Sequence, residues 1–209
     1  MGHVQSTGFL RDNPEGRAPW SSHRFRPWFM VAAVAWVLVA GPCLRAQSSK
    51  PTDYDVKAAY LYNFGHFVEW PANVAFAQND SFTVCVLGQD PFGSVLDATL
   101  AGETIAGKRV AAKRISTPQE SGNCQILFLS SAEDARLNTT IKTLNKQAVL
   151  TVSDMPQFSQ RGGMIQFVLE GKKIRFEVNL AAAQQAGLTL SSELLKVATT
   201  VRRNSSSGD

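Results

Sequence analysis

Histidine and cysteine are both scarce in this sequence, which has three of each among 209 residues. Beyond residue 46 there is one histidine, His66, and there are two cysteines, Cys85 and Cys124. A serine or cysteine nucleophile needs a histidine base beside it, and a zinc site needs clustered histidine and cysteine ligands. With 38 residues between the two cysteines, such a cluster is not available. We therefore expect no catalytic residues, no metal site and no cofactor, and we predict that the protein is not an enzyme.

Nucleotide-binding and hydrolase motifs are missing as well. Beyond residue 46 there is neither a G-x-G-x-x-G fingerprint nor a G-x-S-x-G nucleophile elbow. The segment from Gly88 to Ser94 has the glycine spacing of a phosphate-binding loop, but Ser94 stands where the lysine should be. Without that cation, bound phosphates lose their main charge partner. We interpret the segment as an ordinary turn between a strand and a helix.

The first 46 residues differ in composition from the rest of the chain. A polar start that carries four arginines leads into an apolar stretch between Pro27 and Pro42, and Ala46 is followed by a polar segment. The apolar stretch, about 15 residues, is too short to span a bilayer comfortably. This order is typical of a secretory signal peptide. We predict that residues 1–46 are a signal peptide cleaved after Ala46; an uncleaved membrane anchor is the alternative.

Removing this leader nearly balances the charge of the chain. The leader holds five basic and two acidic residues of the 21 and 17 in the whole sequence, so 16 and 15 remain. A net charge of +1 does not favour nucleic-acid binding. The remaining 163 residues suit one domain with a proper core. We predict that this domain covers residues 47–203 and that the serine-rich tail, 204–209, is disordered.

Strands and helices alternate through the first part of this domain. An aromatic helix is expected over 53–69, capped by Asp53 or Asp55 and stopped by Pro71, with its rings packed on a sheet. β-type runs at 82–88, 110–115, 125–129 and 148–152 are interleaved with helices over 91–100 and 131–146. Such alternation predicts β-α-β units on a parallel sheet.

The pattern changes after residue 160. Two β runs, 164–169 and 173–178, flank the turn at Gly171 and predict a hairpin. Asn179 is expected to cap a short helix, and Ser191 or Ser192 a last helix that reaches about Arg202. The predicted fold is therefore α/β, a three-layer sandwich. Its sheet is mostly parallel, with an antiparallel hairpin added near the C-terminal end and helices on both faces.

Two features of the strands leave alternatives open. In an exported protein Cys85 and Cys124 are a disulfide candidate. Two buried thiols are the alternative, because mid-strand cysteines on adjacent parallel strands have poor geometry for a bond. In the strand from 174 to 178, Arg175 and Glu177 face away from the apolar positions. They form either a solvated or self-paired face, or a polar patch for a ligand or partner.

Motifs at both ends of the domain resemble one known family. They are AAYLYNF at 58–64, FVEWP at 67–71, GGMI at 162–165, RFEVNL at 175–180, AGL at 186–188, LSS at 190–192 and LL at 194–195. In this order they resemble the YfiR family over about residues 54–201. Its better-known members are periplasmic α/β proteins that form dimers, carry disulfides and restrain an inner-membrane diguanylate cyclase.

The resemblance implies a function for this chain. It implies a periplasmic, non-enzymatic regulator that forms a homodimer and represses an inner-membrane diguanylate cyclase or another membrane sensor, lowering cyclic-di-GMP signalling and biofilm formation. Cys85 and Cys124 match one family disulfide, whereas a second cysteine pair of some members, around residues 159–166, is absent. The residues expected to bind the partner or a ligand are Asn63, Glu69, Trp70, Arg175 and Glu177. A periplasmic small-molecule sensor is the alternative function.

Overall fold

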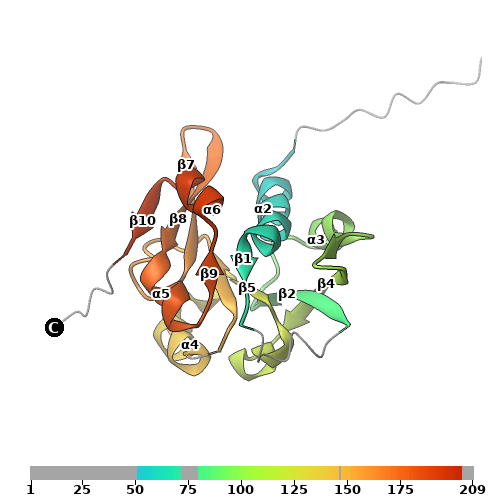
Figure 1. Ribbon diagram of the computed structural model, residues 1–209, viewed down its shortest axis with the longest axis horizontal. Helices are drawn as coiled ribbons and strands as arrows, with labels where there is room; N and C mark the ends of the chain where they lie inside the picture. The colour runs from blue at the N-terminus through green and yellow to red at the C-terminus, as the bar shows by residue number, and fades with distance from the viewer. Residues whose placement is uncertain (1–50, 72–79, 146, 204–209) are drawn as a thin grey trace, which may run out of the picture. The chain divides into compact units, whose positions relative to one another are not determined.

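An eight-stranded sheet organises the residues that the computed structural model describes, 51–71, 80–145 and 147–203 (Figure 1). The predicted signal peptide, its cleavage site after Ala46 and the predicted tail lie outside these ranges. The strands of the sheet are β2 (Ser81–Leu87), β3 (Thr104–Ile105), β4 (Lys108–Ile115), β5 (Ile126–Leu129), β6 (Leu150–Ser153), β7 (Ile165–Glu170), β8 (Lys173–Asn179) and β10 (Thr200–Arg202).

The remaining elements are helices and a small second sheet. β1 (Val68–Glu69) and β9 (Thr189–Leu190) pair antiparallel with each other. The α-helices are α2 (Asp53–Phe67), α3 (Ser94–Leu100), α4 (Leu137–Leu144), α5 (Leu180–Gln185) and α6 (Ser192–Val197). Two 3₁₀ helices, η2 (Pro118–Asn123) and η3 (Ser131–Arg136), complete the set in the described ranges.

The strand order of the large sheet is β10-β8-β7-β6-β5-β2-β4-β3. Of the strand pairs described in it, β3–β4 and β7–β8 are antiparallel and the other five are parallel. Every residue of β5 and β6 is buried, as expected for parallel strands covered on both faces. The predicted fold class, with its mostly parallel sheet and antiparallel hairpin, is confirmed.

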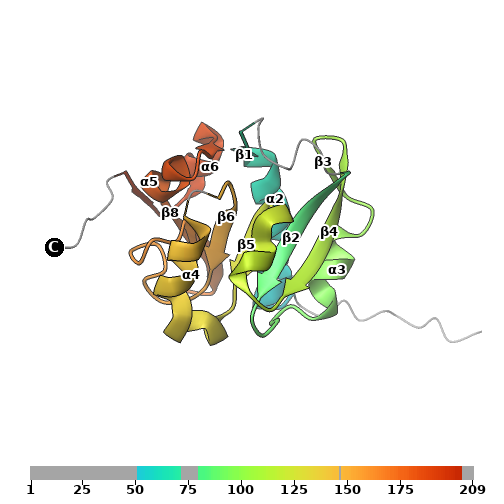
Figure 2. The ribbon, with the colours of Figure 1, turned by 90° about the horizontal axis from the view of Figure 1, so that it is seen from below.

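Two hydrophobic cores lie on the two faces of this sheet because successive strand residues point to opposite sides. Val84 and Val86 of β2 belong to the core that also takes buried residues from α2, α3, α5 and α6. Cys85 and Leu87 belong to the other core, which takes residues from α4 and Phe158. The helices therefore form the outer layers of the sandwich, with α5 on one face of the sheet and α4 on the other (Figures 1 and 2).

The aromatic helix α2 packs its rings on the sheet as the sequence predicts. Tyr60 and Phe64 both contact Phe167 of β7 and Phe176 of β8, with ring centroids 5.2–5.9 Å apart. The cap of this helix differs from the prediction, since Thr52 rather than an aspartate is the N-cap residue. Asp55 instead completes a capping box with Thr52, and this reciprocal bonding satisfies backbone donors at the helix start.

Several predicted helix boundaries are wrong by a few residues. α2 ends at Phe67 instead of Glu69, because Val68 and Glu69 pair with β9. α3 begins at Ser94 instead of residue 91, and the segment predicted as one helix over 131–146 begins as η3 and continues as α4. These shifts come from tertiary pairing and from loop contacts that local sequence does not encode.

The largest error concerns the last predicted helix. α6 ends at Val197, and Thr200–Arg202 form β10, which pairs parallel with β8. Ala198 is already extended, and Thr199 donates hydrogen bonds from its backbone N–H and its hydroxyl to the carbonyl of Phe176. The β-branched residues Thr200 and Val201 favour a strand. The free edge of β8 supplies the backbone hydrogen bonds with which this segment forms β10.

Candidate functional site

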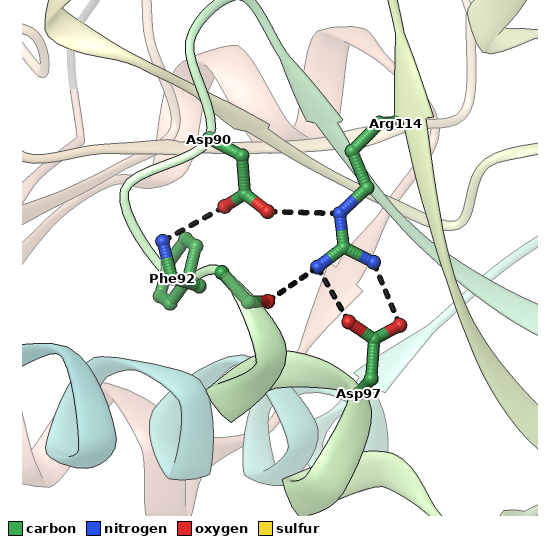
Figure 3. Close-up of polar contacts among 5 residues, drawn as sticks. Asp90, Phe92, Asp97 and Arg114 are labelled. Carbon is green, nitrogen blue, oxygen red and sulfur yellow. Dashed lines mark hydrogen bonds and ion pairs between the residues drawn. The ribbon is translucent and has the colours of Figure 1, made fainter.

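Arg114 of β4 joins its strand to the loop and helix that follow β2 (Figure 3). Its Nε donates to Asp90 Oδ2 at 2.8 Å, and its two terminal nitrogens donate to both carboxylate oxygens of Asp97 at 2.7 Å. One of these nitrogens also donates to the carbonyl of Gly93, and Asp90 Oδ1 accepts from the backbone N–H of Phe92. All three nitrogens of the guanidinium therefore donate hydrogen bonds to groups of the same chain.

This arrangement shifts the pKa values of charged groups beside the loop at residues 88–94, which has the glycine spacing of a phosphate-binding loop. The hydrogen bonds from Arg114 lower the pKa of Asp97, and the same bonds raise the pKa of Arg114. Gly88 and Gly93 both adopt positive φ, which bends the chain between β2 and α3. The contacts hold the loop in place, and the cation nearest to it is already paired with two carboxylates.

A second charged network connects α2 to the end of β6. Lys57 Nζ lies 2.6 Å from Asp154 Oδ2, and the hydroxyl of Tyr54 donates to the same oxygen at 3.1 Å. Lys57 also lies over the ring of Tyr54, 4.2 Å from its centroid. Burial, together with the Asp154 carboxylate, raises the pKa of Tyr54 to about 12. The network fixes the N-terminal turn of α2 against the sheet.

Cys85 and Cys124 form a disulfide, with 5.8 Å between their Cα atoms. Both residues are buried. Cys124 follows η2 and precedes β5, so the pair is not the mid-strand arrangement that disfavours a bond; the β5 partner of Cys85 in the sheet register is Leu127. The bond ties β2 to the segment that leads into β5.

Hydrogen bonds around Ser159 hold residues 159–166, a stretch that contains no cysteine. Gln166 Oε1 accepts from the backbone N–H of Ser159 at 3.1 Å, and the Ser159 hydroxyl donates to Glu177 Oε2 at 2.9 Å. Asn179 Nδ2 donates to the carbonyl of Ser159, while Asn179 Oδ1 caps α5 by accepting from the backbone N–H of Ala182. In this chain the stretch is held by hydrogen bonds between β7, β8 and the preceding loop.

A cavity of about 730 Å³ lies beside this network, between α4, α5, β10 and the loop before β7. The lining residues are Asn138, Ile141, Lys142, Leu144, Asn145, Thr151, Ser159, Gln160, Arg161, Gly162, Met164, Asn179, Ala182, Gln185, Ala186 and Arg202. The walls thus combine amide and basic groups with a few apolar side chains.

The structure separates the predicted site residues into two groups. Asn63 on α2 and Glu69 on β1 are exposed, and Trp70 is half-buried with its ring edge-on to Phe82. Arg175 on β8 is exposed, and neighbouring Glu177 is half-buried.

The sheet lies between these groups. Phe176 contacts α2, and Arg175 and Glu177 point to the opposite face. Glu177 alone approaches the cavity, through Ser159.

Most residues that line the cavity were not anticipated from the sequence. Asn179 was expected only as a helix cap, and Arg202 was placed at the end of a helix. The lining residues come from five separate stretches of chain, so their sequence spacing carries no common signal. Arg202 belongs to the three-residue strand β10, and its position at the cavity follows only from the pairing of β10 with β8.

Metal and membrane features are limited in the described part of the chain. Within residues 51–71, 80–145 and 147–203, no three His, Cys, Asp or Glu side chains gather closely enough to hold a metal ion. Over the same ranges no helix combines the length and apolar character needed to cross a membrane.

The fold and these contacts define an α/β domain with a mixed sheet, internally paired charges and a polar cavity. The chain belongs to the YfiR/HmsC-like family, whose model matches residues 54–199. No curated protein matches the chain.

Two solved structures are among those similar to this chain. One is an ABC domain from Streptococcus pneumonia in complex with L-Trp, at 12% identity and a TM-score of 0.47, covering 69% of this chain and 60% of that one. The other is a conserved domain protein from Vibrio cholerae O1 biovar El Tor, at 11% identity and a TM-score of 0.48, covering 74% and 62%. The chain thus spans less than two thirds of either protein.

Proposed function

We propose that this protein is a periplasmic regulator that binds and represses an inner-membrane diguanylate cyclase, and so lowers cyclic-di-GMP signalling and biofilm formation. The observation that carries the proposal is the family match over residues 54–199, which spans nearly all of the described domain. Repression by binding requires no reactive group. The pairing of Arg114 with Asp90 and Asp97, and of Lys57 with Asp154, supports a structural use of these charges.

We further propose that the cyclase is contacted by the α2–α6 face, which we define by Asn63, Phe67, Glu69 and Val197. Phe67 and Val197 are exposed apolar side chains, at 38% and 60% exposure, and Asn63 and Glu69 are exposed polar neighbours of Phe67. The two elements are joined directly, since the backbone N–H of Ser191 donates to the carbonyl of Phe67 at 2.8 Å. Exposed apolar side chains with a polar rim are typical of binding surfaces.

Loss of the protein tests the proposal in cells. We expect deletion to raise cyclic-di-GMP and biofilm mass, and complementation with the full chain to restore both. Affinity capture of the tagged protein from membranes should recover a diguanylate cyclase with a periplasmic region. Unchanged cyclic-di-GMP after deletion, together with no cyclase in the captured material, would contradict the proposal.

Charge insertion tests the proposed face. Phe67→Asp and Val197→Asp should weaken cyclase capture and raise cyclic-di-GMP, because a carboxylate would be buried at the contact. Leu169→Asp is the control, since Leu169 is as exposed as Val197, at 61%, but lies in the β7–β8 hairpin. Equal loss of repression in all three variants would count against the α2–α6 face while leaving the repressor function itself intact.

The remaining predictions concern assembly, export and the other residues expected to bind a partner, Trp70, Arg175 and Glu177. We propose that the protein is a homodimer, which light scattering on the purified protein will test. We propose export with cleavage after Ala46, so that the periplasmic form begins at Gln47 by mass spectrometry. Trp70 is proposed to support the α2–α6 face, and Arg175 and Glu177 are proposed as a separate contact on the other face of the sheet.

A further inference from the structure

The cavity between α4 and α5 has an unbalanced set of charges. Its lining includes Lys142, Arg161 and Arg202, and no aspartate or glutamate is among the described residues that line it. Five amide side chains, from three asparagines and two glutamines, also line the walls. A space of about 730 Å³ is in the size range of small-molecule sites in proteins. The electrostatic environment of this cavity therefore favours an anion.

Lys142 and Arg202 are the cations of this cavity without a described ion pair, and Arg202 is the more buried of the two. Its Nε is buried and has no hydrogen-bond partner among the described residues, and no described ion pair includes Arg202. Arg161, in contrast, is paired with Asp134. A buried donor on a charged group is costly when it is left unmatched. In Arg114 of the same domain, by contrast, all three guanidinium nitrogens donate hydrogen bonds.

The strand register places Arg202 where a ligand can reach it. Arg202 of β10 is the parallel register partner of Asn179 of β8, and both residues line the cavity. Asn179 is fixed by its bonds to Ser159 and Ala182. One wall of the cavity is therefore a rigid, hydrogen-bonded edge of the sheet that carries a guanidinium.

We infer that this cavity binds a small organic carboxylate, with Arg202 as the main charge partner. A guanidinium presents two parallel N–H donors that match the two oxygens of a carboxylate. The amide groups around it supply further donors, and Lys142 at the exposed rim attracts the anion. The apolar side chains of Ile141, Leu144 and Met164 form a wall for the carbon skeleton of the ligand. The inference is independent of cyclase repression.

Titration of the purified protein with benzoate, hexanoate and citrate, each compared with its neutral amide, tests the inference. In ¹H–¹⁵N spectra at low salt, at least one of the carboxylates should shift the side-chain amide signals of the cavity and the Nε–H signal of Arg202, and the neutral amides should not. If no carboxylate shifts these signals at millimolar concentration, or if the neutral amides shift them equally, the inference is wrong.

Substitutions then assign the charge partner. Arg202→Gln should weaken carboxylate binding at least about tenfold, since a charge-assisted hydrogen bond is lost. Arg202→Lys should bind with intermediate affinity, because it retains the charge but not the paired donors. Arg203→Gln is the matched control, an exposed neighbour outside the cavity lining. Equal weakening by Arg203→Gln would overturn the assignment, and Arg202→Lys remains informative if Arg202→Gln does not fold.

Discussion

Lys57 of α2 and Asp154, the residue that follows β6, form an ion pair with 2.6 Å between Nζ and Oδ2. The side chains are only 10% and 17% exposed, so removal of one partner leaves a largely buried charge. Asp154→Asn should therefore lower the free energy of unfolding by about 3 kcal/mol, measured by urea denaturation at pH 7. Replacing both residues, as in Lys57→Met with Asp154→Leu, should recover most of the loss.

An exposed pair provides the control for this first prediction. Arg161 pairs with Asp134, whose side chain is 58% exposed. Asp134→Asn should change the free energy of unfolding by less than about 1 kcal/mol, because solvent screens such pairs. If Asp134→Asn and Asp154→Asn are equally destabilising, burial is not what makes the Lys57 pair important.

Tyr54 should make the stability of the domain depend on pH at the alkaline end. Its pKa is raised to about 12 in the folded protein from the ordinary 10.0. The folded state thus holds the phenolic proton more tightly than the unfolded state, and this contribution is complete below pH 10. It is lost as the pH rises from about 10 to about 12. Tyr54→Phe should flatten the decline in unfolding free energy over that window; an unchanged slope would contradict the assignment.

The disulfide between Cys85 and Cys124 should be a main stabilising constraint. It links residues 39 apart, and limiting the unfolded chain in this way contributes up to about 4 kcal/mol. The double variant Cys85→Ala, Cys124→Ala should lose much of this in urea denaturation under oxidising conditions. Added reductant should have little further effect on the variant. Because both sulfurs are buried in the native protein, alkylation is done in denaturant: it should label neither cysteine without reductant and both after reduction, and two thiols that react in denaturant without reductant would contradict the bond.

Gly163 should tolerate no side chain. A Cβ added there would lie 2.1 Å from the ring of Phe158, a fully buried residue of the α4-side core. Gly163→Ala should therefore destabilise the protein by about 3 kcal/mol through overpacking. Gly122→Ala is the matched control, since its Cβ would meet no atom within 4 Å. Thermal unfolding of both variants will compare them, and equal melting temperatures would contradict the packing argument.

The parts of the fold that follow from local pattern were predicted correctly. Apolar runs such as 125–129 have to be covered on both faces, and the turn at Gly171 between two β runs forms a hairpin in the structure. Asn179 caps α5 as its side chain and position suggest. These features depend on residues that are close together in the sequence, so their physical basis is visible there.

The parts that were missed depend on pairing between distant segments. β10 forms because β8 has a free edge with which it can pair, and residues 198–203 contain no signal from which that free edge could be predicted. The cavity needs α4, the loop before β7 and β10 together, and Arg202 reaches it only in the strand conformation. Of the binding residues expected from the sequence, only Glu177 approaches this site, through its hydrogen bond with Ser159.

The two ends of the large sheet restrict how the protein can associate with others. β3 at one edge has two residues and β10 at the other has three, so each covers only part of the strand beside it: β3 pairs with Lys108 and Arg109 of β4, and β10 pairs with residues 177–179 of β8. Strand addition by a second chain is therefore limited to the remaining parts of β4 and β8, and short edge strands are one way in which natural proteins limit edge-to-edge aggregation. The proposed dimer and partner contacts therefore have two possible routes, strand addition at β4 or β8 and contacts through side-chain surfaces, and point substitutions on those surfaces test the second route.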